Sequence, residues 1–481
     1  MSEFSDYFKS ILSLKKINVY NLALQADVDR STIHKVASGS RIPNRVFLDR
    51  IMRYLPITPI EKKQLLEKFQ ICRDGPDVYE RRKRVRAIIS DLMQLNLSYD
   101  AVSFSLHHSE DRLKILRGAQ SIRLAIIEMV EREVYTHKNP RIFMKVPPCE
   151  LIDVQFIAVI CANGPEKVDC IHIFGIDSEN SLASQNENLE LLRKVMPYCF
   201  VDNLNYQPHY FYETKEHRDD VMQIIPYSLM TSECILQMNY DMKSAVLSKQ
   251  PQIIDYFSDE FSKLLKHTLP LSARKSTAIS IVQHFIEILQ SSNGPICYFE
   301  QSPNFSCVID EAFVRRRIRQ DLKNRDQVVE NVVIRFNLIR SRHERFHTYF
   351  TQEGLARFVH TGVLVNTIPI YDLPFSIEDR LYLLNHFIEE AESRRICARL
   401  LNPFDSEISE NISITSFGRD SLNIAAYNLP GEEMRTVCMT EANLTSAFQD
   451  YLIWLEDSDL VLSEEESIKA LKSARDMLLP T

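Results

Sequence analysis

Glycine is scarce in this chain: only ten of its 481 residues are glycine, about 2% where an average protein has roughly 7%. No two of them lie within six positions of each other. The phosphate-binding loop GxxxxGK and the dinucleotide-binding turn GxGxxG need closer pairs, so neither motif can occur in the chain. This argues against ATPases and kinases built on a glycine loop and against dinucleotide-dependent enzymes.

Cysteine pairs and long apolar runs are also missing. The ten cysteines form no CxxC pair, and their spacing fits neither a zinc site nor a disulfide framework, so we expect buried, reduced thiols. No stretch approaches 18 consecutive apolar residues, which predicts no membrane-spanning helix and no membrane partner. The N-terminus lacks the basic segment and apolar core of a signal peptide, and we therefore expect a cytoplasmic protein.

Two catalytic signatures are absent as well. The chain has no GxSxG nucleophile elbow and no HxK, which a phospholipase-D-type active site requires. Paired carboxylates such as Glu389 and Glu390 fall on predicted helix surfaces, where they look like solvated groups. We predict no enzymatic activity and no cofactor.

Charge is distributed unevenly along a chain whose 45% hydrophobic content is ample for three or four domains. Residues 1–90 contain 18 Lys and Arg against 10 Asp and Glu, a net charge of +8. Because the whole chain carries −8, the remainder carries −16. A basic head on an acidic body predicts that a nucleic acid would meet the head alone.

Within the basic N-terminal part, residues 1–72 are predicted to form a small all-α domain, called the head below. Apolar spacing predicts helices over 4–15, 19–26 and 30–37, with Asn18 and Asp29 as N-caps and Gly39 ending the third. Two more helices are expected, one in "NRVFLDRIMRYL" with Val46, Phe47, Ile51 and Leu55 inward, and one in "IEKKQLLEKFQI".

The residues around the third helix resemble the lambda-repressor/Cro-like (XRE) helix-turn-helix family, and the resemblance covers residues 4–71. The matching positions are Leu22-Ala23, Ala26, Val28, Ser31-Thr32-Ile33, Lys35, Gly39, Arg41 and Pro43. In that family the third helix enters the major groove of DNA. The resemblance implies base contacts from Arg30, Ser31 and Lys35, support or a phosphate contact from Thr32, and backbone contacts from Ser38, Ser40 and Arg41.

The same resemblance implies a homodimer on double-stranded DNA, since family members usually bind inverted half-sites. The Gln or Asn that the family often uses to read bases is absent at positions 30, 31 and 35, which favours guanine contacts. The alternative is a helix-turn-helix that mediates protein contacts only.

Two further basic segments could contact an anion or lie on a solvated surface. A neck over 73–97 contains Arg81, Arg82, Lys83, Arg84 and Arg86, which would add phosphate contacts or form a solvated helix face. The run "FVRRRIRQDLKNR" at 313–325 would line an anion pocket, touch DNA or, as the plainest interpretation, form another solvated face.

For the body we predict an α+β domain at 98–230, a helical segment at 231–295 and an α+β C-terminal domain at 296–481. A hairpin is expected at 152–161 and 168–176, and strands at 411–417, 421–428 and 434–439. Strands followed by a helix occur near 150–200 and again at 411–456, through either a distant duplication or two unrelated units. The predicted fold class is mainly α with α+β parts: a five-helix head and a mostly helical body with short β-hairpins and sheets.

One motif favours metal chemistry. Residues His343 to His347 satisfy HExxH, which on a helix places two histidines on one face to hold zinc, with Glu344 activating water. Arg345 inside the motif argues against this, and no third ligand has a recognisable position. The candidates for that third ligand are Glu353, His360 and Glu378. We predict no metal site and keep His343 and His347 as the alternative.

These patterns together predict a sequence-specific DNA-binding transcriptional regulator. Its large body would dimerise the protein and sense a small-molecule or peptide effector, because it is much larger than dimerisation requires. Two alternatives stay open. One is a helix-turn-helix protein fused to a zinc metallopeptidase, and the other is a phage-defence or toxin–antitoxin regulator whose body binds a protein partner.

Overall fold

The computed structural model divides the chain into two compact units, Met1–Arg84 and Val85–Thr481. The residues described are 2–94, 112–149, 160, 167–179, 181–201, 203–214, 225–275, 277–342, 344–365, 367–402, 409, 411–429 and 432–479.

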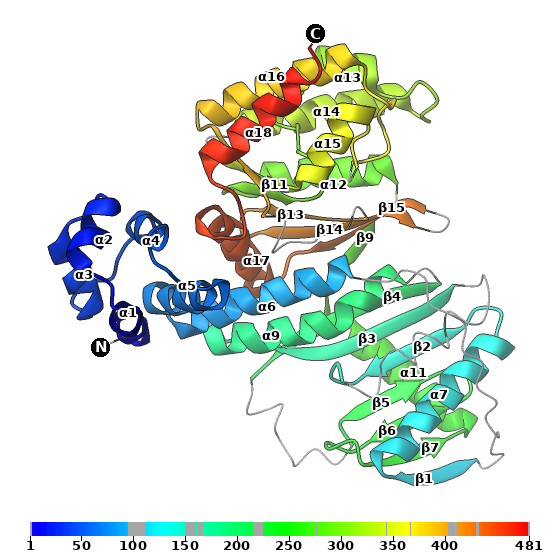
Figure 1. Ribbon diagram of the computed structural model, residues 1–481. Coiled ribbons are helices and arrows are strands. Elements are labelled where there is room, and N and C mark those ends of the chain that lie inside the picture. The colour runs from blue at the N-terminus through cyan, green and yellow to red at the C-terminus, as the bar shows by residue number, and fades with distance from the viewer. Residues whose placement is uncertain are drawn as a thin grey trace. The chain divides into compact units, whose positions relative to one another are not determined.

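The first unit is built from five short helices around one core (Figure 1). They are α1 (Glu3–Leu14), α2 (Val19–Gln25), α3 (Arg30–Ala37), α4 (Arg45–Met52) and α5 (Pro59–Asp74). These bounds match the expected helices closely. The predicted caps are confirmed too, since the Asn18 side chain accepts from the amides of Tyr20 and Asn21, and Asp29 accepts from the amide of Ser31.

One residue of this unit that was predicted to point into the core does not do so. Val46 is 61% exposed, whereas Leu48 is 1% exposed and packs with Ile51 in the core. Helix α4 starts at Arg45 after the N-cap Asn44, and this start turns Leu48 and Ile51, three positions apart, onto the buried face.

The second unit contains two large mixed sheets, and helix α6 (Pro76–Met93) enters it from the first unit. The first sheet has the strand order β1-β7-β6-β5-β2-β3-β4-β8. Its strands are β1 (Leu113–Arg117), β2 (Arg141–Lys145), β3 (Val168–Asp177), β4 (Leu204–Glu213), β5 (Tyr227–Met230), β6 (Ile235–Met238), β7 (Ser244–Ser248) and β8 (Leu269–Pro270). The helices that accompany it are α7 (Ala119–Thr136), α9 (Leu182–Val195), the short 3-10 helix η1 (Met196–Phe200) and α11 (Pro251–Leu265).

The second sheet has the order β12-β11-β10-β13-β14-β15-β9. Its strands are β9 (Ala273–Lys275), β10 (Ile296–Phe299), β11 (Phe346–Phe350), β12 (Ile396–Leu400), β13 (Ile412–Phe417), β14 (Ser421–Leu429) and β15 (Glu432–Met439). Its helices are α12 (Ala278–Ser291), α13 (Glu311–Arg317), α14 (Arg325–Arg340), α15 (Gln352–Thr361), α16 (Ile377–Glu392), α17 (Ala442–Trp454), the 3-10 helix η2 (Leu455–Asp457) and α18 (Glu464–Asp476).

The two sheets repeat one topology. In each, three strands run parallel, β2-β3-β4 in the first and β10-β11-β12 in the second. An antiparallel meander, β5-β6-β7 or β13-β14-β15, then continues from the first of the three strands. The first strand of each half, β1 or β9, closes the far edge beside β7 or β15. This matching order indicates an internal duplication of the body.

The duplicated elements are not the ones that the sequence suggested. The meander at 412–439 corresponds to β5–β7 at 227–248, and β3 corresponds to β11. The sequence pattern instead matched a strand-and-helix segment near 150–200 with one at 411–456. It missed the first meander because residues 231–295, which contain β6 and β7, were predicted to form a helical segment.

The predicted fold class is therefore wrong. The body is not mostly helical with short hairpins, because its two sheets have eight and seven strands. The hairpin predicted for 168–176 is wrong as well: β3 lies between β2 and β4 and is parallel to both. Its expected partner, 152–161, falls almost entirely outside the described residues. The strands at 411–417, 421–428 and 434–439 and the following helix were predicted correctly.

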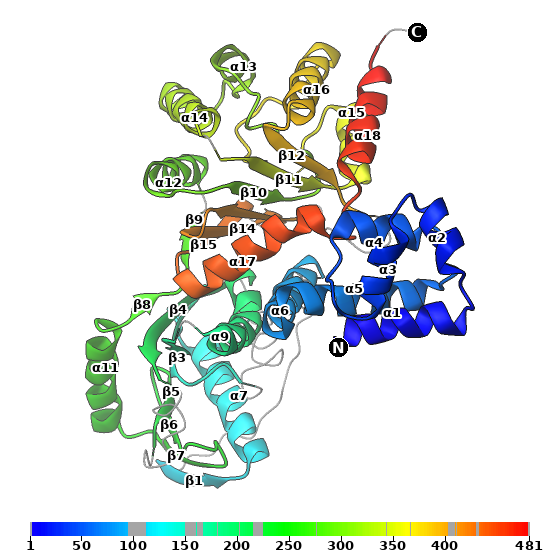
Figure 2. The same ribbon diagram turned by 90° about the vertical axis from the view of Figure 1, so that its left-hand side faces the viewer.

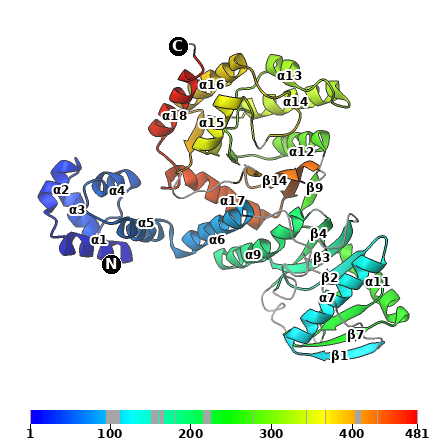
Figure 3. The ribbon, with the colours of Figure 1, turned by 45° about the vertical axis from the view of Figure 1, so that its right-hand side comes forward.

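Helices separate and cover the sheets. Helix α17 lies against α9 between the two sheets, and one hydrophobic core joins them there (Figures 1 and 2). On the first sheet, α7 covers one face and α11 the other (Figure 2). On the second sheet, α12 and α14 cover the face opposite α17. Helix α18 lies beside α15 and α16 (Figure 3). In the described part of the chain, no helix combines the length and the apolarity needed to cross a membrane.

Candidate nucleic-acid interface

Helix α3 presents a continuous polar face. Arg30, Ser31, His34 and Lys35 are all exposed, while Ile33 and Val36, on the opposite side, are buried. Successive helical residues advance by 100°, since 3.6 residues make a turn, so Arg30, Ser31, His34 and Lys35 cover roughly 140° of the helix surface. Of the base-contact residues implied by the resemblance, all three lie on this one face.

His34 belongs to the same face and was missed by the sequence reasoning. It stands four residues after Arg30, a spacing that places two side chains on one side of a helix. That spacing could have identified it, because Ile33 and Val36 already fixed which side is buried.

The turn before α3 holds the helix start in place. The Asp29 carboxylate accepts a hydrogen bond from the Ser31 amide at 2.8 Å. This hydrogen bond, with smaller contributions from the charges of Lys35 and Arg41, lowers the pKa of Asp29 below its ordinary value. Asp27, in the turn between α2 and α3, adopts a positive φ of 50°, a conformation that Asp tolerates better than most residues.

The end of α3 changes the expected roles of two serines. The hydroxyls of Ser38 and Ser40 donate to the carbonyl of Lys35 at 3.0 and 3.1 Å, next to Gly39 with its positive φ of 74°. A phosphate oxygen only accepts hydrogen bonds, so either hydroxyl would have to leave the Lys35 carbonyl to bind DNA. Both serines are exposed, but in this structure they stabilise the helix end.

The cationic groups of this surface form no salt bridge within the described part of the first unit. Arg30, Lys35 and Arg41 are exposed and take part in none of the salt bridges found among residues 2–84. Other basic residues of the unit do pair, as Lys15 does with Glu61 at 3.0 Å. Thr32 is half-buried, which suits support of the helix better than a base contact.

The two other basic segments are largely engaged within the protein. In the neck, Arg82 bonds to Asp74 at 2.6 Å. In the run at 313–325, Arg316 and Arg317 reach Asp379 at 2.8 and 3.2 Å. The run divides between α13 and the segment after it, and these contacts join α13 to the start of α16. Exposed Arg315 and Arg316 fit the solvated face that the sequence favoured, whereas half-buried Arg317 contacts the buried carboxylate of Asp379 within the protein.

The described part of the HExxH segment, residues 344–347, does not form a helix. His347 lies on strand β11 and Glu344 precedes the strand, while His343 is outside the described residues. The helical geometry that the zinc hypothesis needs is therefore absent from this part of the motif. The candidate third ligands Glu353, His360 and Glu378 are exposed and lie on α15 and α16.

His347 belongs to a different cluster. Three side chains meet there: His347, Cys397 on β12 and Glu456 on η2. Each offers one atom that could bind a metal ion, and these three atoms lie within 4.8 Å of one another. Burial, opposed by Glu456, lowers the pKa of His347 to about 4, so the imidazole is neutral at pH 7. Glu456 already forms salt bridges with two guanidinium groups, those of Arg345 at 2.5 Å and Arg399 at 3.5 Å. The positive charges of these two groups would repel a metal ion. We therefore interpret the cluster as an ion-pair network that joins η2 to β11 and β12. Sequence reasoning could not have found it, because its members come from three separate segments.

Comparison with known proteins identifies no relative. No protein-family model and no curated protein matches the chain. Solved structures with some similarity include TrmBL2, an archaeal chromatin protein (TM-score 0.24, 14% identity, 55% of this chain and 99% of that chain). Others are phosphatidylserine synthase of Haemophilus influenzae (0.24, 10%, 82% and 98%) and polyphosphate kinase of Porphyromonas gingivalis (0.21, 10%, 76% and 53%). At TM-scores this low, none of them supports an inference about this chain.

Proposed function

We propose that the protein is a sequence-specific DNA-binding regulator whose first unit inserts α3 into the major groove. The observation that carries the proposal is the polar face of α3, where Arg30 and Lys35 are exposed and form no salt bridge among residues 2–84. Arg and Lys donate to the guanine O6 and N7 atoms, which gives such a face the means to read sequence.

Three further features support this assignment. Helices α2 and α3 are joined by a four-residue turn, as in helix-turn-helix domains. Arg41, just after α3, is exposed and would contact the phosphate backbone. The charge of +8 on residues 1–90 attracts a polyanion, whereas the acidic remainder of the chain repels one.

The proposal extends to the second unit, which would hold two copies of the protein together on inverted half-sites and respond to an effector. A single small reading head makes few contacts, and dimerisation roughly doubles them. The zinc-peptidase alternative loses its basis because His347 is on a strand, and no observation favours the protein-partner alternative over DNA binding.

Genome-wide capture of DNA bound to the full-length protein tests the proposal. We expect enrichment of a short inverted repeat, and loss of that enrichment in the double variant Arg30→Ala with Lys35→Ala. The matched control is Lys62→Ala with Lys63→Ala, which removes two exposed lysines of α5 away from α3. No enriched sequence, together with no salt-dependent affinity for any duplex, would overturn the proposal.

A further inference from the structure

A polar cavity lies on the face of the second sheet that α12 and α14 cover. The volume open to the centres of water molecules is about 60 Å³. A buried water needs about 10–15 Å³ of such space, so the cavity admits a ligand of roughly four to six non-hydrogen atoms. Its walls come from β10, β13, β14, β15, the two helices and the loops near 300–309 and 364–371.

Arg335 of α14 is the charged group of this cavity and is only 6% exposed. Its guanidinium lies over the rings of Phe285 and Phe336, at 4.7 and 5.4 Å from their centroids. One Nη atom donates to the Tyr298 hydroxyl at 3.3 Å, whereas Nε has no hydrogen-bond partner among the described residues. No acidic residue in the described part of the chain forms a salt bridge with Arg335. A buried guanidinium left in this state is costly unless an anion completes its hydrogen bonds.

Glu300 does not supply that anion. It lines the same cavity, is 4% exposed, and receives a hydrogen bond from the Asn304 amide at 2.7 Å. Burial raises the pKa of Glu300 to about 8, even though the Asn304 hydrogen bond and the charge of Arg335 both lower it. The carboxyl is therefore mostly protonated at pH 7 and can donate a hydrogen bond. The cavity then carries the single positive charge of Arg335.

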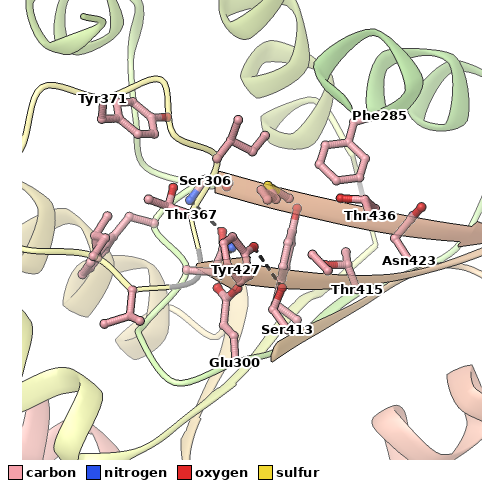
Figure 4. A pocket seen from close by; sticks show the side chains of 18 of the residues that line it. Phe285, Glu300, Ser306, Thr367, Tyr371, Ser413, Thr415, Asn423, Tyr427 and Thr436 are labelled. Carbon is pink, nitrogen blue, oxygen red and sulfur yellow. Dashed lines mark hydrogen bonds between the residues drawn. The ribbon is translucent and has the colours of Figure 1, made fainter. Parts of the chain in front are cut away.

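Hydroxyl groups line the rest of the cavity, as Figure 4 shows for Ser413, Thr415, Tyr427 and Thr436. Ser413 and Tyr427 share a hydrogen bond at 3.1 Å. The Thr436 hydroxyl is buried and has no hydrogen-bond partner among the described residues. Burial raises the pKa of Tyr298, Tyr371 and Tyr427, so all three phenols stay protonated and can donate.

We propose that this cavity binds a small anion through a carboxylate or phosphate group, which the buried guanidinium of Arg335 would hold. Arg offers two parallel N–H donors to a planar oxyanion, and the surrounding hydroxyls supply further donors. The apolar rings of Phe285 and Phe336 fix the guanidinium and exclude water, which strengthens its pairing with an anion. This site stands apart from the DNA-binding proposal, because it lies wholly within the second unit and its occupancy is measured without DNA.

Isothermal titration of the full-length protein tests the site, with acetate, pyruvate and inorganic phosphate as probes at constant ionic strength. We expect at least one of the three to bind saturably, at one site per chain. Acetamide, which has the shape of acetate without its charge, is the matched ligand control and should not bind. Preference for acetate and pyruvate would identify a carboxylate as the natural group, and preference for phosphate a phosphate.

Two variants link binding to the cavity. Arg335→Leu should weaken binding at least about 30-fold, because it removes the charged partner of the anion. Thr436→Val, which keeps the side-chain volume, should weaken it by about tenfold through loss of one hydroxyl. Lys263→Ala, an exposed lysine of α11 in the other half of the body, should leave binding unchanged.

Thermal unfolding distinguishes a ligand-binding role for Arg335 from a purely structural one. If its charge serves a ligand, Arg335→Leu without ligand should melt at the same temperature as the wild type or higher, since an uncompensated buried charge has been removed. Its melting temperature should also stop responding to the anion. The proposal is overturned if none of the three anions binds the wild type, if acetamide binds as tightly as acetate, or if both variants bind as the wild type does.

Discussion

The carboxylate of Glu133 accepts hydrogen bonds from both the backbone amide and the hydroxyl of Ser232, at 2.8 and 2.6 Å. It also accepts from the amide of Arg141 at 2.8 Å. Glu133 is 1% exposed and lies on α7, while Ser232 is in the turn between β5 and β6 and Arg141 begins β2. One buried carboxylate thus joins a helix, the central strand β2 and the meander of the first half.

We predict that Glu133→Ala lowers the free energy of unfolding by about 3 kcal/mol, because it removes the shared acceptor of three hydrogen bonds that join α7 to β2 and the meander. Glu133→Gln should cost less, since the amide keeps one accepting oxygen. Urea denaturation followed by circular dichroism measures both. Ser232→Ala, which removes one of the three hydrogen bonds, is the control and should fall between wild type and Glu133→Ala. Equal stability of Glu133→Ala and wild type would contradict this account.

Arg41 and Lys35 should differ in how they contribute to DNA affinity. Lys35 lies on the face of α3 that would meet base edges, so Lys35→Ala should cost about 1–3 kcal/mol on the preferred sequence and little on random DNA. Arg41 follows the helix and would meet phosphate. Arg41→Ala should weaken all sequences alike and reduce the slope of log affinity against log salt by about one.

Fluorescence anisotropy with a specific and a scrambled duplex, each at several salt concentrations, separates the two effects. Lys62→Ala, on α5, is the control for general loss of positive charge. A change of specificity by Arg41→Ala, or a uniform loss by Lys35→Ala, would reverse the assignment of the two residues.

The five helices of the first unit were predictable because each is encoded by local signals. Asn18 and Asp29 cap the helices that follow them, and apolar residues recur at helical spacing, as with Phe4, Phe8 and Ile11. Such signals act over a few residues, and a single sequence displays them directly. The exposed face of α3 followed from the same pattern, since Ile33 and Val36 fix its buried side.

The sheets of the body were harder to predict because their order depends on pairing between distant segments. Strands such as β5 and β6 are only four residues long, and a window of that size does not distinguish a short strand from a helix turn. Parallel strands buried on both faces, as in β11 and β12, lack the alternation that marks a half-exposed strand. The Arg335 cavity was equally hidden, because it needs the register of β13 and β14 as well as the fold of α14.

We predict that the His347 cluster does not hold zinc in the wild-type protein. Arg345 and Arg399 both lie within salt-bridge distance of Glu456, and their positive charges repel a dication. Protein purified with zinc and then dialysed should contain well below one zinc per chain by mass spectrometry. The double variant Arg345→Met with Arg399→Met should bind more zinc than the wild type, because Glu456 loses its cationic partners. Stoichiometric zinc in the wild type that disappears in His347→Ala would revive the metal hypothesis.

Glu300 should make the stability of the protein depend on pH in a defined window. Its pKa is about 8 in the folded protein and near its ordinary value of 4.5 in the unfolded chain. Between these values the folded state holds a proton that the unfolded state has released. Stability therefore falls as pH rises from 4.5 to 8, by up to about 1.4 kcal/mol for each pH unit, and this contribution is constant above 8.

Glu300→Gln removes the titrating group while keeping a neutral side chain of the same shape. Subtracting the unfolding free energy of Glu300→Gln from that of the wild type at each pH isolates the contribution of Glu300. The difference should decline steadily from pH 5 to pH 8 and then become constant. Glu353→Gln, an exposed residue in the first turn of α15, should give a flat difference across the same range. A flat curve for Glu300→Gln as well would mean that this carboxyl is ionised in the folded protein, so that Arg335 already has its counter-charge and the cavity has no net charge with which to attract an anion.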